Sequence, residues 1–347
     1  MRENRMNTHI SRIALVMLPA VVLLMFMLGW GMGLFTNIDE ETDTNEASDS
    51  IVVGVSQLGS ESGWRTANTE SVQRAFTRQN GYFMIFSNAR QKQENQIKAI
   101  RNFISQRVDY IVLAPVVESG WDTVLQEAKD AGIPVIIMDR SVKVEDESLY
   151  VTCVGTNSVE EGQKAGRWLE EHLIRQKKAD EDINIVVLKG TEGASAQIGR
   201  TAGFSMIAGE HDNWHILEQE YADFTIYKGK EVMARFLNKY ENIDVVVSQN
   251  DDMTFGAIEA IRESGRTVGV GGDITIISFD AVHDALEMVA EGTINVDIEC
   301  NPEQGEYISE VIRMLENGEE VEKRYYVEED IFTMENVTQE VLDTRIY

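Results

Sequence analysis

The sequence has 347 residues, 43% of them hydrophobic and 26% charged, which is typical of a globular protein with room for two domains. Acidic residues outnumber basic ones by 59 to 31, for a formal net charge of −28 at pH 7. Phosphate backbones repel so acidic a chain, which argues against a nucleic-acid partner and favours a well-solvated surface.

The first 35 residues combine a basic start with a long uncharged segment. Three arginines lie among the first 12 residues, and no charged residue occurs from Ile13 to Phe35. As a helix, this segment would be about 35 Å long, enough to cross a hydrocarbon layer of ~30 Å. Two interpretations remain open: an uncleaved membrane anchor, favoured by the length, and a cleaved signal peptide. Both predict an extracytoplasmic chain, with the acidic residues 36–50 as a linker.

From residue 51, short apolar runs alternate with amphipathic segments of helical period. In the segment 94–106, for example, Ile97, Ile100, Phe103 and Ile104 share one helix face. Such alternation predicts β-α-β units, which build a parallel sheet with helices on both faces. The first set has predicted strands at 51–56, 82–86, 110–113 and 134–138, and predicted helices at 64–80, 94–106 and 121–130.

A second set of the same kind follows along the chain. Its predicted helices are 159–175, 197–208, 228–238, 253–264 and 282–291, with a late helix at 304–316. Its predicted strands are 183–188, 215–217, 244–248, 274–279 and 294–298. Two successive parallel-sheet units predict an α/β protein of two lobes, and the space between lobes is the usual place for a small-molecule site.

Polar side chains follow several apolar runs, at the carboxyl ends of strands where open α/β sheets bind ligands. They are Trp64, Arg65, Asp139, Arg140, Arg200, Asn250 and Asp280. This set offers carboxylates, guanidinium groups, an amide and an indole, without an obvious nucleophile–base pair. It indicates a polar, uncharged ligand held by hydrogen bonds and ring stacking, for which a sugar is the natural candidate.

Each of these residues also has a purely structural interpretation. These alternatives are Trp64 as a core residue, Arg65 and Arg200 in surface ion pairs, Asp139 and Arg140 paired with each other, Asp280 as the cap of helix 282–291, and Asn250 as a turn residue.

The two cysteines, Cys153 and Cys300, both fall in predicted strands. An exported chain can pair them in a disulfide, but two buried free thiols are the favoured interpretation, because the sequence gives no sign that they lie close together. The histidines show no zinc-type spacing with these cysteines, so we expect no metal site and no cofactor.

Six segments extend the argument from composition to family. They are residues 56–65 (SQLGSESGWR), 91–99 (QKQENQIKA), 114–117 (APVV), 138–141 (MDRS), 250–253 (NDDM) and 256–258 (GAI). At matched spacing over roughly 51–325, the chain resembles type I periplasmic sugar-binding proteins of ABC importers, and within them the galactofuranose-binding members. The ten-residue opening motif is the most specific part of this likeness.

The resemblance implies two lobes, each a parallel β-sheet flanked by helices, with the chain crossing between them near Thr156–Asn157, Cys300–Asn301 and residues 325–330. The N-terminal lobe is then 51–156 plus 300–328, and the C-terminal lobe 157–299 plus 329–347. The sugar contacts that the resemblance implies are Glu61, Ser62, Gly63, Trp64, Arg65, Asp139 and Arg140 from the first lobe, and Arg200, Asn250 and Asp280 from the second.

As a function, the resemblance implies capture of a monosaccharide, galactofuranose or a related sugar, and its delivery to the permease of an ABC transporter, without enzymatic activity. An alternative is an anchored sugar sensor that presents its liganded state to a membrane kinase or chemoreceptor. A glycosidase using Glu61 with Asp139 or Asp280 would need two carboxylates about 5–9 Å apart, flanking a glycosidic bond. No further feature for binding a polymer accompanies them, which disfavours that alternative.

Overall fold

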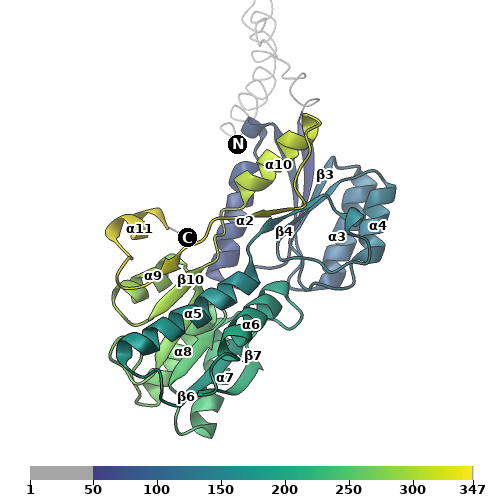
Figure 1. Cartoon of the computed structure of the whole chain (residues 1–347). Helices are drawn as coiled ribbons and strands as arrows, with labels where there is room; N and C mark the ends of the chain where they lie inside the picture. Colours follow the sequence, from purple (N-terminus) through teal and green to yellow (C-terminus); the bar gives the residue numbers. More distant parts are fainter. Residues whose placement is uncertain (1–49, 346) are drawn as a thin grey trace, which may run out of the picture. The chain divides into compact units, whose positions relative to one another are not determined.

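The computed structural model describes residues 50–345 and 347, and the residues from Ile51 onward form one unit. Within this unit the strands make two separate six-stranded sheets, on which lobe 1 and lobe 2 are built (Figure 1). The candidate anchor, Ile13–Phe35, and nearly all of the linker lie outside the described residues. Among the helices that are described, none is both long enough and apolar enough to cross a membrane.

Lobe 1 is a parallel sheet in the order β11-β5-β4-β3-β1-β2. Its strands are β1 (Ile51–Gln57), β2 (Tyr82–Asn88), β3 (Tyr110–Leu113), β4 (Val135–Asp139), β5 (Thr152–Gly155) and β11 (Arg324–Tyr326). Its helices are α2 (Gly63–Ala75), α3 (Gln93–Gln106), α4 (Asp122–Asp130) and α10 (Gly305–Glu316). Successive residues of β3 alternate between two cores: Val112 packs in the cluster that includes Ile308 of α10, and Ile111 in the cluster that includes Phe103 of α3.

Lobe 2 repeats this plan in the order β12-β10-β9-β8-β6-β7. Its strands are β6 (Ile183–Lys189), β7 (Trp214–Tyr221), β8 (Val245–Ser248), β9 (Thr275–Asp280), β10 (Val296–Glu299) and β12 (Ile331–Phe332). Its helices are α5 (Ser158–Gln176), α6 (Ser195–Ala208), α7 (Ile226–Lys239), α8 (Asp251–Glu263), α9 (His283–Ala290) and α11 (Gln339–Thr344). The short strand β12 runs antiparallel to β10, so the expectation of a wholly parallel sheet is wrong at this edge.

The chain passes between the sheets three times: from β5 to α5, from β10 to α10, and from β11 to β12. The late helix α10 therefore packs beside α2 in lobe 1, although most of lobe 2 precedes it in the sequence (Figure 1). The crossings leave β5, β10 and β11 at their carboxyl ends, and the predicted site residues Asp139 and Asp280 lie at the carboxyl ends of β4 and β9.

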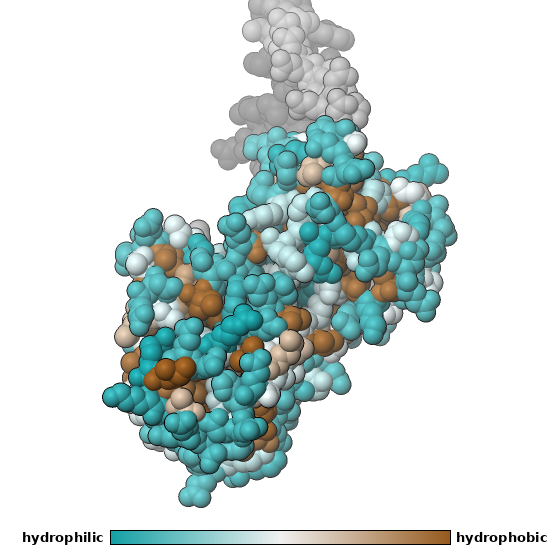
Figure 2. Space-filling model, viewed as in Figure 1, coloured by the Kyte–Doolittle hydropathy of each residue, from teal (hydrophilic) through white to brown (hydrophobic). Residues whose placement is uncertain are grey.

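One helix boundary differs from the sequence-based expectation, and the state of the cysteines agrees with it. The helix predicted at 64–80 ends at Ala75 and is followed by a separate short 3-10 turn at Arg78–Asn80. Cys153 and Cys300 are both buried free thiols, as the favoured interpretation held. On the face shown in Figure 2, hydrophilic residues cover most of both lobes and apolar residues form small separate patches, in keeping with the acidic composition.

Candidate functional site

One pocket gathers nearly all of the predicted site residues from both lobes. The side chains around it nearly fill the space between the lobes and leave a free volume of about 20 Å³, room for about one water molecule, so a ligand of monosaccharide size requires the lining to move apart. The lining residues are Glu61, Ser62, Trp64, Arg65, Asp139, Arg140, Ala196, Arg200, Phe224, Asn250, Asp280 and Cys300. Of the ten predicted residues only Gly63 does not line this space, and its backbone N–H instead donates to Asp252 of lobe 2.

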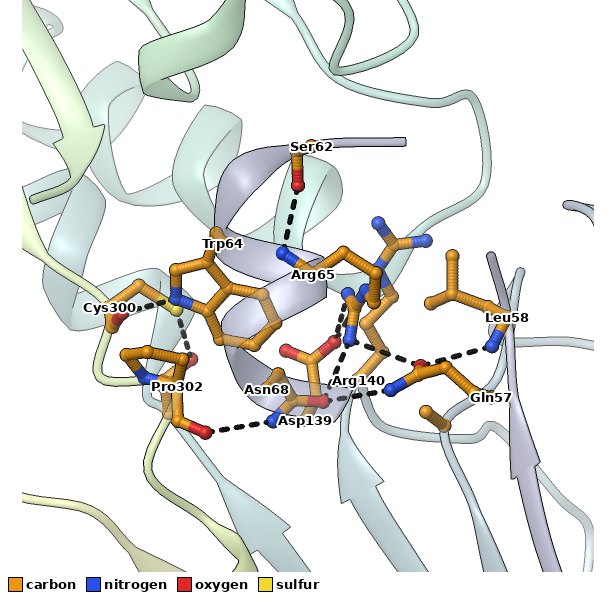
Figure 3. A network of polar contacts seen from close by, with 12 residues as sticks. Gln57, Leu58, Ser62, Trp64, Arg65, Asn68, Asp139, Arg140, Cys300 and Pro302 are labelled. Carbon is orange, nitrogen blue, oxygen red and sulfur yellow. Dashed lines mark hydrogen bonds and ion pairs between the residues drawn. The ribbon is translucent and has the colours of Figure 1, made fainter. Parts of the chain in front are cut away.

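Arg65 is the centre of the polar network in lobe 1 (Figure 3). Ser62 caps α2 by accepting from the backbone N–H of Arg65, which fixes the first turn of the helix that carries the guanidinium. One terminal nitrogen of Arg65 lies 2.5 Å from Asp139 Oδ2, and its Nε lies 3.3 Å from Glu61 Oε1. Burial alone would lower the pKa of Arg65, but the carboxylates of Asp139 and Glu61 raise it above its ordinary value. The surface-pair interpretation of Arg65 is therefore wrong, because this ion pair is buried.

Arg140 is the least neutralised guanidinium of the pocket. Its Nη1 donates to the Val116 carbonyl at 3.1 Å, but its distances to Glu61 and Asp139 are 3.7 and 3.9 Å. Burial, together with the charge of Arg65, lowers the pKa of Arg140. The group lies 5.1 Å from the ring centroid of Phe224, a residue of lobe 2. Arg140 thus has donors left to offer to a ligand, and the interpretation as a simple partner of Asp139 accounts for little of its surroundings.

Trp64 lies in a hydrophobic core and at the pocket wall at the same time. Its side chain is buried within the hydrophobic cluster that includes Phe224, and it also lines the pocket. The indole Nε1 donates to the Cys300 carbonyl in the crossing from β10 to α10, and the Arg65 guanidinium lies 4.6 Å from the ring centroid (Figure 3). The ring is therefore held at a fixed angle between the crossing segment and the pocket.

Arg200 is the counterpart of Arg65 in lobe 2. Its Nε lies 2.5 Å from Glu161 Oε2, one terminal nitrogen lies 3.1 Å from Asp280 Oδ1, and the other donates to the Gln249 carbonyl. Burial would lower the pKa of Arg200, but the carboxylates of Glu161 and Asp280 raise it well above its ordinary value. This buried arrangement also rules out a surface ion pair for Arg200.

Asp139 and Asp280 occupy equivalent places at the last residues of β4 and β9. Both have positive φ angles, 64° and 109°, which non-glycine residues rarely adopt. This backbone turns each carboxylate out of the strand direction and toward the arginine of its own lobe. The alternative role of Asp280 as a helix cap is wrong, because the N-cap of α9 is Val282.

Asn250 is a helix cap that also lines the pocket. Its Oδ1 accepts from the Met253 backbone N–H at 3.0 Å as α8 begins, and its Nδ2 lies 3.4 Å from the Phe224 carbonyl. The structural role of Asn250 is therefore that of a helix cap and not the turn residue that the sequence suggested, while Asp251 and Asp252 lie in the first turn of α8.

The two lobes touch at the mouth of the pocket through hydrogen bonds that join residues far apart in the sequence. These run from Gly63 N to Asp252 Oδ2 at 3.2 Å, from Ser141 N to Ser195 Oγ at 2.8 Å, and from Glu118 N to the Gly193 carbonyl at 2.9 Å. The described arrangement is therefore one in which the lobes enclose the pocket.

Sequence reasoning missed several residues of this site, among them Glu161, Phe224, Cys300 and the cross-lobe acceptor Asp252. Glu161 lies in the first turn of α5, where an acidic residue is ordinarily a helix-end charge. Phe224 lies between β7 and α7, so the only sequence feature that could have identified it as a pocket residue was its position just after a strand.

Comparison with known proteins places this geometry in a family. A family model described as a periplasmic binding protein domain matches residues 53–320. The galactofuranose-binding protein YtfQ of Escherichia coli is 44% identical over 255 residues, which cover 73% of this chain and 78% of that protein.

Solved structures agree with this match. A Mycobacterium smegmatis protein in complex with β-D-fucofuranose superimposes with a TM-score of 0.81 at 42% identity, covering 85% of this chain and 95% of that one. The periplasmic binding component of the arabinose ABC transporter of Shewanella sp. ANA-3, bound to arabinofuranose, has a TM-score of 0.78 at 42% identity with the same coverage. Together with the two-lobe fold and the pocket between the lobes, these matches show that the chain belongs to the periplasmic binding protein family.

Proposed function

We propose that this protein is an extracytoplasmic binding protein that holds a monosaccharide in its furanose form between the lobes and delivers it, chemically unchanged, to an ABC importer. The observation that carries the proposal is the matched pairing of a buried arginine with carboxylates in each lobe: Arg65 with Asp139, and Arg200 with Asp280. Fixed donors and acceptors of this kind suit a ring whose hydroxyls both donate and accept.

The charges around the pocket favour a neutral ligand. Three arginines and three carboxylates line it, which leaves no net positive charge to attract a phosphate or a sugar acid. Glu61 Oε2 is buried and has no hydrogen-bond partner within the described part of the chain. A buried carboxylate oxygen requires a donor, and a sugar hydroxyl supplies one.

The ring size is argued from the relatives. Of three proteins at 42–44% identity, one is a galactofuranose-binding protein, and the other two have structures with β-D-fucofuranose or arabinofuranose bound. A five-membered ring spreads its hydroxyls differently from a six-membered one, so a preorganised pocket leaves donors or acceptors unpaired against the wrong ring. Such unpaired buried groups make discrimination large.

Calorimetry of the full-length protein tests this proposal with two ring-locked ligands, methyl galactofuranoside and methyl galactopyranoside. The methyl group blocks the anomeric hydroxyl, so the free sugars L-arabinose and D-fucose, each at its equilibrium of ring forms, are measured as well. We expect the furanoside to bind at least about tenfold more tightly than the pyranoside. Equal affinities, or a preference for the pyranoside, would overturn the furanose assignment. Chromatography of the recovered ligand separates binding from hydrolysis, since any cleavage of the glycoside would favour the glycosidase alternative.

The transport role needs a cellular measurement. We expect that deletion of the gene abolishes uptake of labelled galactofuranose at low concentration. If uptake continues while a transcriptional response to the sugar is lost, the protein is a sensor instead.

A further inference from the structure

The helices α5 and α6 of lobe 2 touch backbone to backbone. A Cβ atom added to Gly162 would overlap the Arg200 carbonyl, and one added to Gly203 would overlap the Val159 carbonyl. A Cβ atom on Gly199 would lie 2.6 Å from the Cβ of Ser158. These glycines allow α5 and α6 to approach at a separation that larger residues would not permit.

Glu161 occupies this contact, directly behind the pocket arginine. Its side chain is fully buried, and its Oε2 lies 2.5 Å from the Nε of Arg200. The Nε atom is the inner end of the guanidinium, so an acceptor there fixes the plane of the whole group. The outer nitrogens are thereby directed at the Gln249 carbonyl and at Asp280, which lines the pocket.

The other oxygen of Glu161, Oε1, is buried and has no hydrogen-bond partner within the described part of the chain. Glu161, Cys300 and Glu329 each place one potential ligand atom within 4.8 Å of the others. A bound cation would lie beside the charge of Arg200, which disfavours a metal there. Burial, followed by the charge of Glu161, raises the pKa of Glu329 to about 9, so Glu329 is neutral at pH 7 and leaves Glu161 as the partner of Arg200.

We propose that Glu161 is a positioning residue for sugar binding: it contacts no ligand itself but sets the plane in which the Arg200 guanidinium meets the sugar. This inference rests on the proposed function. It means that the orientation of Arg200 in the pocket is set by a residue that does not itself line the pocket.

The test compares variants of the full-length protein by calorimetry with methyl galactofuranoside. We expect Glu161→Ala to weaken binding by about ten- to a hundredfold, the loss associated with a charge-assisted hydrogen bond. Glu161→Gln keeps an oxygen acceptor for Nε and should recover part of that loss, and it also serves if the alanine variant folds poorly. Glu160→Gln is the matched control, because Glu160 lies in the same helix turn, is exposed, and should bind as the parent does.

Two further readouts distinguish positioning from a general structural role. In an Arg200→Ala background, adding Glu161→Ala should cost less than about threefold, because the group through which Glu161 acts is gone. The Nε–Hε resonance of Arg200 in NMR spectra should shift in Glu161→Gln and stay unchanged in Glu160→Gln.

Losses that simply add in the double variant would overturn the inference, and so would parent-like binding by a folded Glu161→Ala variant. A parent protein that binds none of the furanoses would overturn the proposed function and this inference with it.

Discussion

The carboxylate of Asp252 in lobe 2 accepts a hydrogen bond from the backbone N–H of Gly63 in lobe 1, at 3.2 Å across the mouth of the pocket. Gly63 is the first residue of α2, so an acid from one lobe caps the positive end of a helix in the other. This contact exists only while the lobes are together, and the Gly63 N–H offsets part of the cost of burying the Asp252 carboxyl group in the closed state.

At pH 5, where Asp252 is largely protonated in the closed state, we expect Asp252→Ala to weaken sugar binding by about three- to tenfold through faster dissociation, because alanine leaves the Gly63 N–H without its acceptor. Stopped-flow measurement of tryptophan fluorescence, to which Trp64 in the pocket wall contributes, gives the association and dissociation rates. Asp252→Asn keeps an oxygen acceptor and is the matched control. Solution scattering should show the parent becoming more compact on sugar binding, with hinges at the three crossings, and an unchanged radius of gyration at saturating ligand would contradict the closure mechanism.

Closure should also respond to pH through Asp252. Burial raises the pKa of Asp252 to about 6, with Glu61 adding to the effect and the Gly63 N–H opposing it. The closed state therefore holds a proton that the open state, with an ordinary carboxyl pKa near ~3.8, releases. Affinity should fall as pH rises through 6, by up to about tenfold between pH 5 and 7.5. Asp252→Asn should lack this fall, and titrations at several pH values check it.

The paired arginines and acids should be needed for binding. Arg65→Ala, Arg200→Ala and Asp280→Ala each leave buried charged partners unpaired, so each should weaken sugar binding by at least about tenfold while the protein still folds. Lys177 and Lys178 lie on the exposed surface of lobe 2, and alanine at either position should be silent. Parent-like calorimetry for all three site variants would show that the pocket assignment is wrong.

A buried acid pair behind the pocket should make stability depend on pH. Burial raises the pKa of Asp297 to about 7, and it raises that of its neighbour Asp251 as well. Because the folded state binds a proton that the unfolded chain releases above pH ~4, this contribution to stability is present at low pH and is lost as pH rises through about 7.

We therefore expect the melting temperature of the parent to decline from pH 5 to 8. Asp297→Asn mimics the protonated acid and should flatten that decline, which for this group is at most about 3 kcal/mol of unfolding free energy between pH 5 and 8. Asp212→Asn, an exposed acid of the same lobe, should leave the profile unchanged. Equal slopes in the parent and in Asp297→Asn would show that the pair does not titrate in this range.

The N-terminal segment gives a prediction about location. An uncharged run from Ile13 to Phe35 is long enough to span a bilayer, so the full-length protein should fractionate with membranes and need detergent for release. N-terminal sequencing of the mature protein is the check, since a first residue between 33 and 50 would reveal a cleaved signal instead.

The sequence allowed the pocket lining to be predicted because parallel strands end at a common edge, so polar residues that follow apolar runs converge there. Asp139 and Asp280 were found in this way, since each is the last residue of its strand. Their arginine partners, Arg65 and Arg200, were also predicted, but the acid behind Arg200 was harder to find. Glu161 reads as a helix-end acid, and only the close approach of α5 to α6 places it behind Arg200.

The C-terminal elements escaped prediction for a different reason. β11 and β12 have three and two residues, too few to show any periodicity, and each exists because a sheet edge accepts it. The long helix predicted at 64–80 failed at its end because local turn preferences stop α2 at Ala75, and apolar spacing does not register such a stop.

The pairing of Arg324 in β11 with Cys153 in β5 has a consequence for how the protein is made. A chain that emerges from its N-terminus completes nearly all of the second sheet before the first receives α10 and its edge strand. Long-range pairing of this kind is slow, and the exposed edge of β5 remains open to wrong partners in the meantime. We expect a ribosome- or translocon-bound chain to stay sensitive to proteases in its first lobe until residues beyond 326 have emerged, so the order of synthesis keeps the sugar pocket unformed until the protein is almost complete.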